Sequence, residues 1–177
     1  MERGALTFAP AGAHPQLVAA PVHRALGNLE PGAVLASAID PDLADTAAFC
    51  EHYKIAPDQG ANCVIVQAQR GDRTWLAAVL VLGSDRLDVN SAVRKALGAT
   101  KVSFAPMDLA VELTGMEYGG ITPIGLPESW PLLVDSAVAA AEHLVIGSGI
   151  RASKILCSGA VLASLPGAQV LPLAKAG

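Results

Sequence analysis

The sequence predicts an α+β domain with a mixed, largely antiparallel sheet, and three observations support this class. The 177 residues are 52% hydrophobic, 4% aromatic and 16% charged, which is typical of a globular core built from Ala, Val and Leu. Two apolar runs flank Arg70-Gly71-Asp72-Arg73, the pattern of an antiparallel hairpin. Short strand and helix patterns then alternate irregularly, which favours α+β over a regular βαβ order.

Four segments are predicted in the first third of the chain. Residues 1–15 are rich in Gly, Ala and Pro and are expected to be loosely held. Apolar spacing predicts a helix over Leu17–Leu29, interrupted by Pro21, and then a short strand over Gly32–Ser37. An Asp-Pro pair is a helix start signal, so a second helix is expected over Asp40–Tyr53.

The rest of the chain carries the patterns of further short elements. Cys63–Ala68 and Thr74–Leu82 are the strands of the hairpin, and Asp88 or Asn90 caps a helix that Gly98 ends. The other predicted strands are Lys101–Phe104, Leu132–Val134, Leu144–Ile146, Lys154–Cys157 and Gln169–Leu171; the other predicted helices are Pro106–Leu113, a short Ala-rich helix after Asp135, and Gly159–Leu165 after Ser158. No repeat or linker appears, so residues 1–177 are expected to form one domain.

The charge of the chain is weakly negative and unevenly spread. Formal net charge is −4; residues 1–60 hold three basic and seven acidic residues, whereas residues 61–177 hold nine of each. Nucleic-acid binders usually show a basic patch, and none is visible along the whole chain. Any RNA contact must therefore use a local cluster among residues that are otherwise solvated surface charges: Arg70, Arg73, Arg94, Lys95, Lys101, Arg151 and Lys154.

Cysteine number and the apolar runs predict a cytoplasmic protein. Cys50, Cys63 and Cys157 are odd in number and widely spaced, which is typical of reduced thiols. His52 lies between two of them, but the spacing fits no usual zinc ligand pair, and neither a metal nor a cofactor is predicted. No signal peptide is read, and Pro and Gly within the uncharged stretch Ile155–Ala174 favour a helix, turn and strand over a membrane span.

The most distinctive stretch is Thr114–Pro127, which reads T-G-M-E-Y-G-G-I-T-P-I-G-L-P. Four glycines permit close backbone approach and positive φ, while two prolines fix φ. Apolar residues interleaved through it suit a loop that packs on the domain and holds one shape. The loop's backbone N–H groups are therefore expected to meet a ligand, although a merely stiff connector has the same composition.

A second glycine-rich turn, Gly147–Ala152, fits the pattern G-x-G-x-x-A. A dinucleotide site would need a long helix and then a strand ending in an acidic residue, and the remaining chain offers neither. The turn is instead expected to line the same cleft as the main loop. Arg151 and Lys154 beside it are either phosphate contacts or surface charges.

A serine hydrolase assembled from Ser148, His143 and Asp135 is the weakest of the enzyme hypotheses. The sequence lacks a G-x-S-x-G nucleophile elbow. His143 lies in an apolar run that is typical of a core histidine, and Asp135 is most simply a helix cap.

The glycine-rich loop also carries a family resemblance. Thr114-Gly115 followed by Gly119-Gly120-Ile121-Thr122-Pro123-Ile124-Gly125 resembles the signature of the YbaK-type aminoacyl-tRNA deacylases, a family related to the editing domain of bacterial prolyl-tRNA synthetases. The resemblance covers about Ala61 to Leu173 and is strongest over Lys101–Lys154. It implies a compact α+β domain around a mixed, curved sheet surrounded by short helices.

The resemblance implies hydrolysis of the ester between a wrong amino acid and tRNA, typically tRNA for proline. The family's Gly-x-x-Pro loop maps onto Gly120–Pro123, where backbone amides would hold the ester and the terminal ribose hydroxyl would assist a water. The expected partners are aminoacyl-tRNA and, further, an aminoacyl-tRNA synthetase. The predicted catalytic residues are Asn62, Gly120 and Pro123, and the predicted substrate-binding residues are Thr114, Gly119, Ile121, Thr122, Asp135, Ser148, Gly149, Arg151 and Lys154.

The sequence departs from the family at Asn62, which stands where many members have a lysine entering the first long strand. Asparagine offers two donors and one acceptor but no charge, so it can orient an ester or a water yet cannot neutralise a phosphate. Two main hypotheses follow: a free-standing trans-editing deacylase, and a non-catalytic module of the same fold that binds an aminoacyl group, a small ligand or a protein partner.

Overall fold

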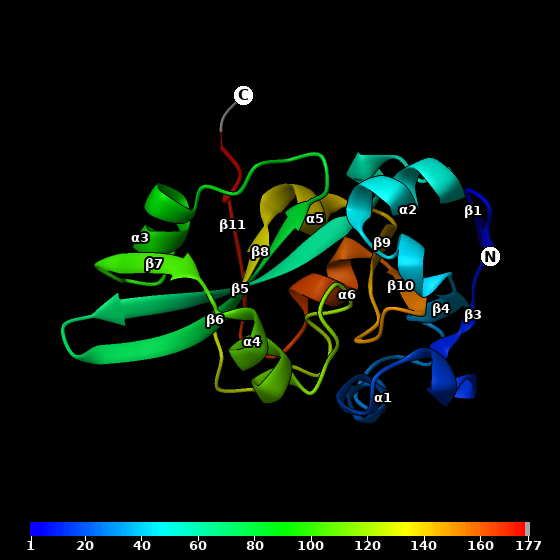
Figure 1. Ribbon diagram of the computed structural model, residues 1–177, viewed down its shortest axis with the longest axis horizontal. Helices are drawn as coiled ribbons and strands as arrows, with labels where there is room; N and C mark the ends of the chain where they lie inside the picture. Colours follow the sequence, from blue (N-terminus) through cyan, green and yellow to red (C-terminus); the bar gives the residue numbers. More distant parts are fainter. Residues whose placement is uncertain (176–177) are drawn as a thin grey trace.

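Two open β-sheets with short helices around them form the frame of the protein in the computed structural model, which describes residues 1–175 (Figure 1). The larger sheet has the strand order β11-β8-β6-β5-β7. Its strands are β5 (Ala61–Arg70), β6 (Arg73–Leu82), β7 (Lys101–Phe104), β8 (Leu132–Asp135) and β11 (Ala168–Leu171). β5 pairs antiparallel with β6 and β7, whereas β8 pairs parallel with both β6 and β11, so this sheet is mixed.

The hairpin of β5 and β6 is the longest element of the fold, and the sequence explains its register. The pairing runs from Ala61 opposite Leu82 to Arg70 opposite Arg73, which leaves a two-residue turn. Gly71 in that turn has a φ of 59°, a conformation that glycine adopts without a Cβ penalty. The side chains of β6 alternate between the two faces of the sheet, and its central residues are all buried.

The second sheet is antiparallel throughout, with the order β3-β4-β10-β9. Its strands are β3 (Ala9–Pro10), β4 (Leu35–Ala38), β9 (Leu144–Gly147) and β10 (Ser153–Cys157), and a two-stranded ribbon of β1 (Glu2–Arg3) and β2 (Leu6–Thr7) lies near it at the N-terminus. An isolated parallel bridge from Gly60 to Val145 links the start of β5 to β9, so the two sheets approach each other there.

Short helices cover the sheets and close the core. They are α1 (Ala20–Leu26), α2 (Thr46–Tyr53), α3 (Arg94–Ala96), α4 (Met107–Thr114), α5 (Ser136–Ala140) and α6 (Gly159–Ala163), with 3-10 helices at Ala11–Ala13, Pro15–Leu17, Pro41–Leu43 and Pro57–Gln59 and a π-helix at Val89–Val93. The largest core cluster draws on both sheets and on α1, α5 and α6; Ile65, Leu80, Leu144, Ile155 and Leu162 belong to it. Burial of these side chains is the main force that holds the sheets together.

The predicted fold class is confirmed: the domain is α+β with a mixed sheet and an antiparallel sheet, both open, and short helices around them. The strands are divided between the two larger sheets and the β1–β2 ribbon instead of forming one sheet. The helix expected over Asp40–Tyr53 is also divided, because Asp40 caps only the 3-10 helix and the backbone is extended at Asp45 before α2 begins.

The first segments of the chain differ in detail from the sequence expectation. Residues 1–15, expected to be loosely held, form the short strands β1–β3, and buried Leu6 and Phe8 anchor them in a core cluster with Ile55. The helix expected from Leu17 begins instead at Ala20, since Pro21 suits a first helical turn, where its missing N–H costs nothing. Within residues 1–175, no helix has both the length and the apolar character needed to cross a bilayer.

Candidate functional site

A pocket of about 450 Å³ lies where the two sheets approach each other, a volume in the range of small-molecule sites. Its lining comes from the first half of β5, from α2, from β9 and β10, and from the glycine-rich loop. Four of the predicted site residues line it: Asn62, Gly119, Ile121 and Lys154. The sequence therefore brings together residues that are up to 92 positions apart (154 − 62) at one cavity.

The glycine-rich loop is held against the turn that follows β9 by direct backbone contact. The Gly149 N–H donates to the Gly120 carbonyl at 2.7 Å, and the Glu117 N–H donates to the Gly149 carbonyl at 2.8 Å. A Cβ on Gly120 would lie 2.7 Å from backbone atoms of Ile150, and one on Gly147 would lie 2.7 Å from the Ile121 carbonyl oxygen. Glycine at these positions is what lets the two backbones touch. Of the second turn, Gly147 lines the same pocket as Gly119 and Ile121 of the main loop.

Two residues of the loop that line the pocket have backbone N–H groups without an acceptor in the described part of the chain. The Gly120 N–H is used internally, since it donates to the Glu117 carbonyl at 3.0 Å. Among residues 1–175, the N–H groups of Gly119 and Ile121 have no hydrogen-bond acceptor, and both residues line the pocket. An unpaired N–H beside a cavity is available to a ligand's carbonyl or oxyanion oxygen.

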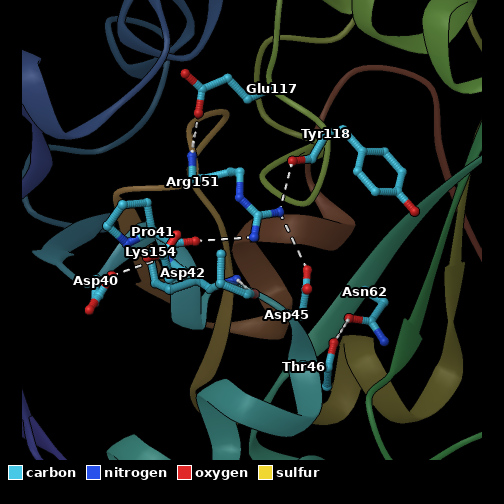
Figure 2. Close-up of polar contacts among 11 residues, drawn as sticks. Asp40, Pro41, Asp42, Asp45, Thr46, Asn62, Glu117, Tyr118, Arg151 and Lys154 are labelled. Carbon is cyan, nitrogen blue, oxygen red and sulfur yellow. Dashed lines mark hydrogen bonds and ion pairs between the residues drawn. The ribbon is translucent and has the colours of Figure 1, made fainter.

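Asn62 lies on β5, where its exposed side-chain amide contacts Thr46. The Thr46 hydroxyl, at the start of α2, donates to Asn62 Oδ1 at 3.3 Å (Figure 2). In this orientation the amide nitrogen has no hydrogen-bond partner among residues 1–175. Since Asn62 lines the pocket, the amide is available to donate a hydrogen bond to a ligand there.

Lys154 brings a positive charge to the pocket from β10. Its Nζ donates to the Ala44 carbonyl at 3.0 Å and lies 5.1 Å from the centroid of the Phe49 ring, a cation–π distance. Burial lowers the pKa of the Lys154 ammonium, and the nearby Arg151 lowers it further, while Asp45 and Cys50 act in the opposite direction. The pocket therefore contains a cation even though Asn62 is neutral.

Arg151 joins the glycine-rich loop to the segment before α2. Its guanidinium donates to the Tyr118 carbonyl at 3.3 Å, to the Pro41 carbonyl at 3.1 Å and to the Asp45 carboxylate at 3.4 Å (Figure 2). Its own backbone N–H donates to the Glu117 carboxylate at 2.6 Å. These contacts engage the guanidinium with the protein itself, so Arg151 positions the loop.

Four other predicted site residues, Ser148, Thr114, Thr122 and Pro123, lie outside the pocket lining. Ser148 is fully buried; its Oγ lies 2.7 Å from Ser153 Oγ, so the expectation that it faces the ligand is corrected. Thr114 is buried at the end of α4, where its hydroxyl donates to the Ala110 carbonyl at 2.7 Å. Thr122 is fully buried, and within residues 1–175 its hydroxyl has no hydrogen-bond partner. Pro123 lines a separate cavity of about 410 Å³ beside Trp130.

Asp135 is confirmed as a helix cap and has a second structural role. Its Oδ1 accepts the Ala137 N–H at 2.9 Å, and its Oδ2 accepts the N–H groups of Leu173 and Ala174 at 2.7 and 3.0 Å. The carboxylate is 3% exposed. His143 is half-buried. Among the hydrogen bonds of residues 1–175, none joins it to Asp135 or Ser148, so these three residues form no triad.

Two cysteines line the pocket, and neither provides a thiolate at neutral pH. Burial raises the pKa of the Cys63 thiol to about 12. It also raises the pKa of Cys50, although Lys154 partly opposes that shift. Because the thiolate is the nucleophilic form, these shifts disfavour either cysteine as a nucleophile.

Sequence reasoning missed the pocket residues that come from α2 and from the start of α4. Thr46, Phe49 and Cys50 face the cavity from α2, and Met107 faces it from α4. Phe104 also lines the pocket; it is the last residue of β7, and the sequence had predicted only a strand there. An aromatic residue in a chain with few aromatics was the one available signal.

The fold and the pocket define an α+β ligand-binding domain in which a glycine-rich loop forms one wall. The family model for the aminoacyl-tRNA editing domain matches residues 40–165, which is more than half of the chain. The chain therefore belongs to the aminoacyl-tRNA editing domain family. The resemblance read from the glycine-rich loop is confirmed, and the match begins about 20 residues earlier than Ala61.

Curated relatives are proline–tRNA ligases. That of Listeria monocytogenes serotype 4b (strain F2365) is 34% identical over 108 residues, covering 61% of this chain and 18% of the ligase. That of Nautilia profundicola is 28% identical over 128 residues, covering 72% of this chain and 22% of the ligase. The chain thus spans about a fifth of the length of these relatives.

Solved structures share the fold. A chain described as a proposed trans-editing enzyme for prolyl tRNA synthetase superposes with a TM-score of 0.74 at 20% identity, covering 88% of this chain and 96% of the other. A hypothetical protein superposes with a TM-score of 0.75 at 22% identity, covering 88% of this chain and 99% of the other. At these identities the likeness establishes the fold alone.

Proposed function

We propose that this protein is an aminoacyl-tRNA deacylase that acts in trans on mischarged tRNA, with tRNA for proline as the substrate. The observation that carries the proposal is the pocket wall at Gly119–Ile121, where two backbone N–H groups lack partners among residues 1–175. Family membership and the prolyl-tRNA ligase relatives supply the substrate class.

The reaction follows from the donors around the pocket. The ester carbonyl of the aminoacyl group lies against the N–H groups of Gly119 and Ile121, which stabilise the oxyanion that forms when water attacks. The amide nitrogen of Asn62 donates to the same ester from β5. Removing one donor of this kind costs about 10²–10³ in rate in well-studied enzymes. The terminal ribose hydroxyl assists the attacking water, so no side-chain nucleophile is needed.

Lys154 replaces the charge that Asn62 lacks. Its ammonium lies on β10 within the same pocket lining, and the Ala44 carbonyl and the Phe49 ring hold it in place. A fixed cation in a partly buried site stabilises negative charge more strongly than one in water. In this proposal Lys154 supports the developing oxyanion electrostatically, and Asn62 orients the ester.

Amino-acid selection depends on the size of the pocket. The residues around it are largely apolar, with Phe49, Ile65 and Val145 among them. A difference of one methylene in such a pocket changes transition-state binding by only about 1–3 kcal/mol. Contacts to the tRNA therefore contribute to specificity beside the pocket.

A deacylation assay tests the proposal. tRNA for proline is charged with alanine, cysteine or proline, and a few other mischarged tRNAs are run in parallel. We expect release of at least one amino acid by the wild type and a reduced rate for Asn62→Ala. A wild type that binds aminoacyl-tRNA but releases nothing from any substrate would overturn the proposal in favour of the non-catalytic binding module. The neutral side chain of Asn62, where many family members have a lysine, is the observation that favours this second function.

A further inference from the structure

The mouth of the pocket is unusually apolar for an exposed surface. Six large hydrophobic side chains are exposed among residues 1–175, and three of them line this one pocket: Phe104, Met107 and Tyr118. Their exposed fractions are 66%, 50% and 57%. The chain has only seven Phe, Trp and Tyr residues in all, so two exposed aromatics at one opening are a marked concentration. Exposed apolar clusters of this kind mark ligand or partner contacts.

The three side chains come from separate segments that are each fixed in place. Phe104 ends β7, where it pairs with Val66 of β5, and Met107 begins α4 three residues later. Tyr118 belongs to the glycine-rich loop, and its carbonyl accepts a hydrogen bond from Arg151. Figure 2 shows the Tyr118 ring pointing away from Arg151, on the side of the backbone opposite that hydrogen bond. The rings are thus presented by backbone that is already ordered, so binding costs little entropy.

The two cations beside the pocket already have other contacts, and the proposed reaction assigns Lys154 to the oxyanion. Lys154 is held by the Ala44 carbonyl, and the Arg151 guanidinium is held by Asp45 and two carbonyls. The recognition that remains at the mouth is stacking on aromatic faces. Base–aromatic stacking is the usual way in which proteins hold unpaired nucleotides.

Resting on the proposed function, we infer that Phe104 and Tyr118, with Met107 beside them, hold the base of the ester-bearing terminal adenosine of the tRNA by stacking. If the ester carbonyl lies at Gly119–Ile121, the nucleoside attached to it must leave through the mouth. Tyr118 directly precedes Gly119 in the chain, and both residues line the pocket. When the ester lies against the loop, the base therefore lies beside Phe104 and Tyr118, which form the aromatic rim of the pocket.

Binding of two stable analogues tests the inference without turnover. The first is alanine joined by an amide to 3′-amino-3′-deoxyadenosine; the second is the same amide on a ribose that lacks the base. Both are titrated into the full chain by calorimetry. We expect Phe104→Ala and Tyr118→Ala each to weaken binding of the adenosine analogue by roughly 5- to 150-fold, the range for loss of one stacked base, and to leave the base-free analogue unchanged.

Matched variants separate stacking from general damage. Leu113→Ala and Val170→Ala remove exposed hydrophobic side chains that do not line the pocket, and both are expected to bind like the wild type. Tyr118→Phe keeps the ring and is expected to retain affinity. Because stacking carries little charge, the affinity for the adenosine analogue should change little between 50 and 200 mM salt.

Three outcomes would overturn the inference. Wild-type affinity for the adenosine analogue in both alanine variants would remove the stacking role, as would an equal loss for both analogues, which would make the rings part of the amino-acid pocket. Unchanged nucleoside binding together with loss of a bound synthetase would assign the rim to a protein partner. If the wild type deacylates tRNA in any of these cases, the proposed function stands and only the stacking role falls; if it deacylates nothing, the proposed function falls independently.

Discussion

The carbonyl of Gly120 accepts a hydrogen bond from the N–H of Gly149 at 2.7 Å, so the two glycine-rich turns of the chain are joined backbone to backbone. This contact holds the backbone of Gly119–Ile121, which forms one wall of the pocket, against the second turn. The wall is built from main-chain atoms, and their close approach depends on the absence of Cβ atoms at Gly120 and Gly147.

Gly120→Ala is expected to damage both stability and activity. The new methyl group would lie 2.7 Å from the Ile150 backbone, and backbone cannot move aside as a flexible side chain can. We expect a loss of about 1–3 kcal/mol in the free energy of unfolding, as for other overpacked sites, together with a loss of deacylation. Urea denaturation measures the first. Gly12→Ala, where nothing lies within 4 Å of the added Cβ, is the matched control and should leave both nearly unchanged.

Asn62→Asp tests whether the amide nitrogen of Asn62 is the functional group. The aspartate keeps an acceptor for the Thr46 hydroxyl but loses both donors and adds a negative charge to the pocket. We expect kcat to fall by about 10²-fold or more, as when an oxyanion donor is lost. Thr46→Val should have a smaller effect, since it releases the amide without removing it. Equal activity in Asn62→Asp and the wild type would contradict this role.

Ser148→Ala separates a structural serine from a nucleophile. The Ser148 hydroxyl is buried against Ser153 Oγ and the Ile150 and Ser153 carbonyls. Its loss should reduce the free energy of unfolding by about 1–3 kcal/mol because buried partners are left unpaired, while kcat per folded molecule stays the same. Complete inactivity in a folded variant, with Asn62→Ala active, would revive the serine hydrolase.

Arg151→Ala is expected to loosen the glycine-rich loop. It removes the donors to the Tyr118 and Pro41 carbonyls that connect the loop to the segment before α2. Misplacement of the loop by about 1 Å can cost up to ~10²-fold in rate, so kcat should fall and proteolysis near Tyr118 should quicken. Asp45→Asn is the matched control: the Arg151–Asp45 pair is exposed, with the Asp45 side chain 71% accessible, and such pairs contribute about 0–1 kcal/mol.

Lys154 is expected to make the free energy of unfolding increase with pH in the alkaline range. Since its pKa is lowered in the folded protein, the unfolded chain binds more protons between that lowered pKa and the ordinary value of 10.5. The free energy of unfolding therefore gains a contribution as the pH rises through this window and loses it as the pH falls. Urea denaturation at pH 7 and 10.5 should show the wild type gaining stability relative to Lys154→Met at the higher pH.

Lys101→Met, which removes a charge at an exposed position of β7, controls for the general loss of a positive charge. The contributions of Cys63 and Cys157 cancel in the comparison, because burial alone raises their pKa values. The pKa of Cys50 is raised further in Lys154→Met, since Lys154 lowers it in the wild type, and this adds to the expected difference. A wild type that loses stability relative to Lys154→Met as the pH rises would contradict the direction assigned here.

The sequence was most informative where local chemistry decides the structure. The hairpin around Gly71, the Asp135 cap and the ends of α4 and β7 follow from turn, cap and strand preferences within a few residues. The split of the Asp40–Tyr53 segment was not predictable in this way, because the extended backbone at Asp45 belongs to a tertiary arrangement in which Arg151 contacts Pro41 and Asp45.

The candidate site shows the same division. Asn62, Gly119, Ile121 and Lys154 were found from motif and position, and they do line one pocket. Ser148 and Thr114 have the residue types of a polar site, yet only their hydrogen-bond partners reveal that both are buried supports. The residues of α2 and the aromatic rim carry no motif, since they reach the pocket through packing between segments far apart in sequence.

The bridge between Gly60 and Val145 places the pocket across the line where the two sheets meet, with β5 supplying one side and β9 and β10 the other. A molecule bound there touches both halves of the protein at once and acts as a brace between them. A bound ligand should add RT ln(1 + [L]/Kd) to the free energy of unfolding and so raise the melting temperature. It should also oppose separation of one sheet from the other. Thermal unfolding can therefore rank candidate amino acids attached to a stable analogue of the tRNA end. The amino acid that binds most tightly is the one that raises the melting temperature most.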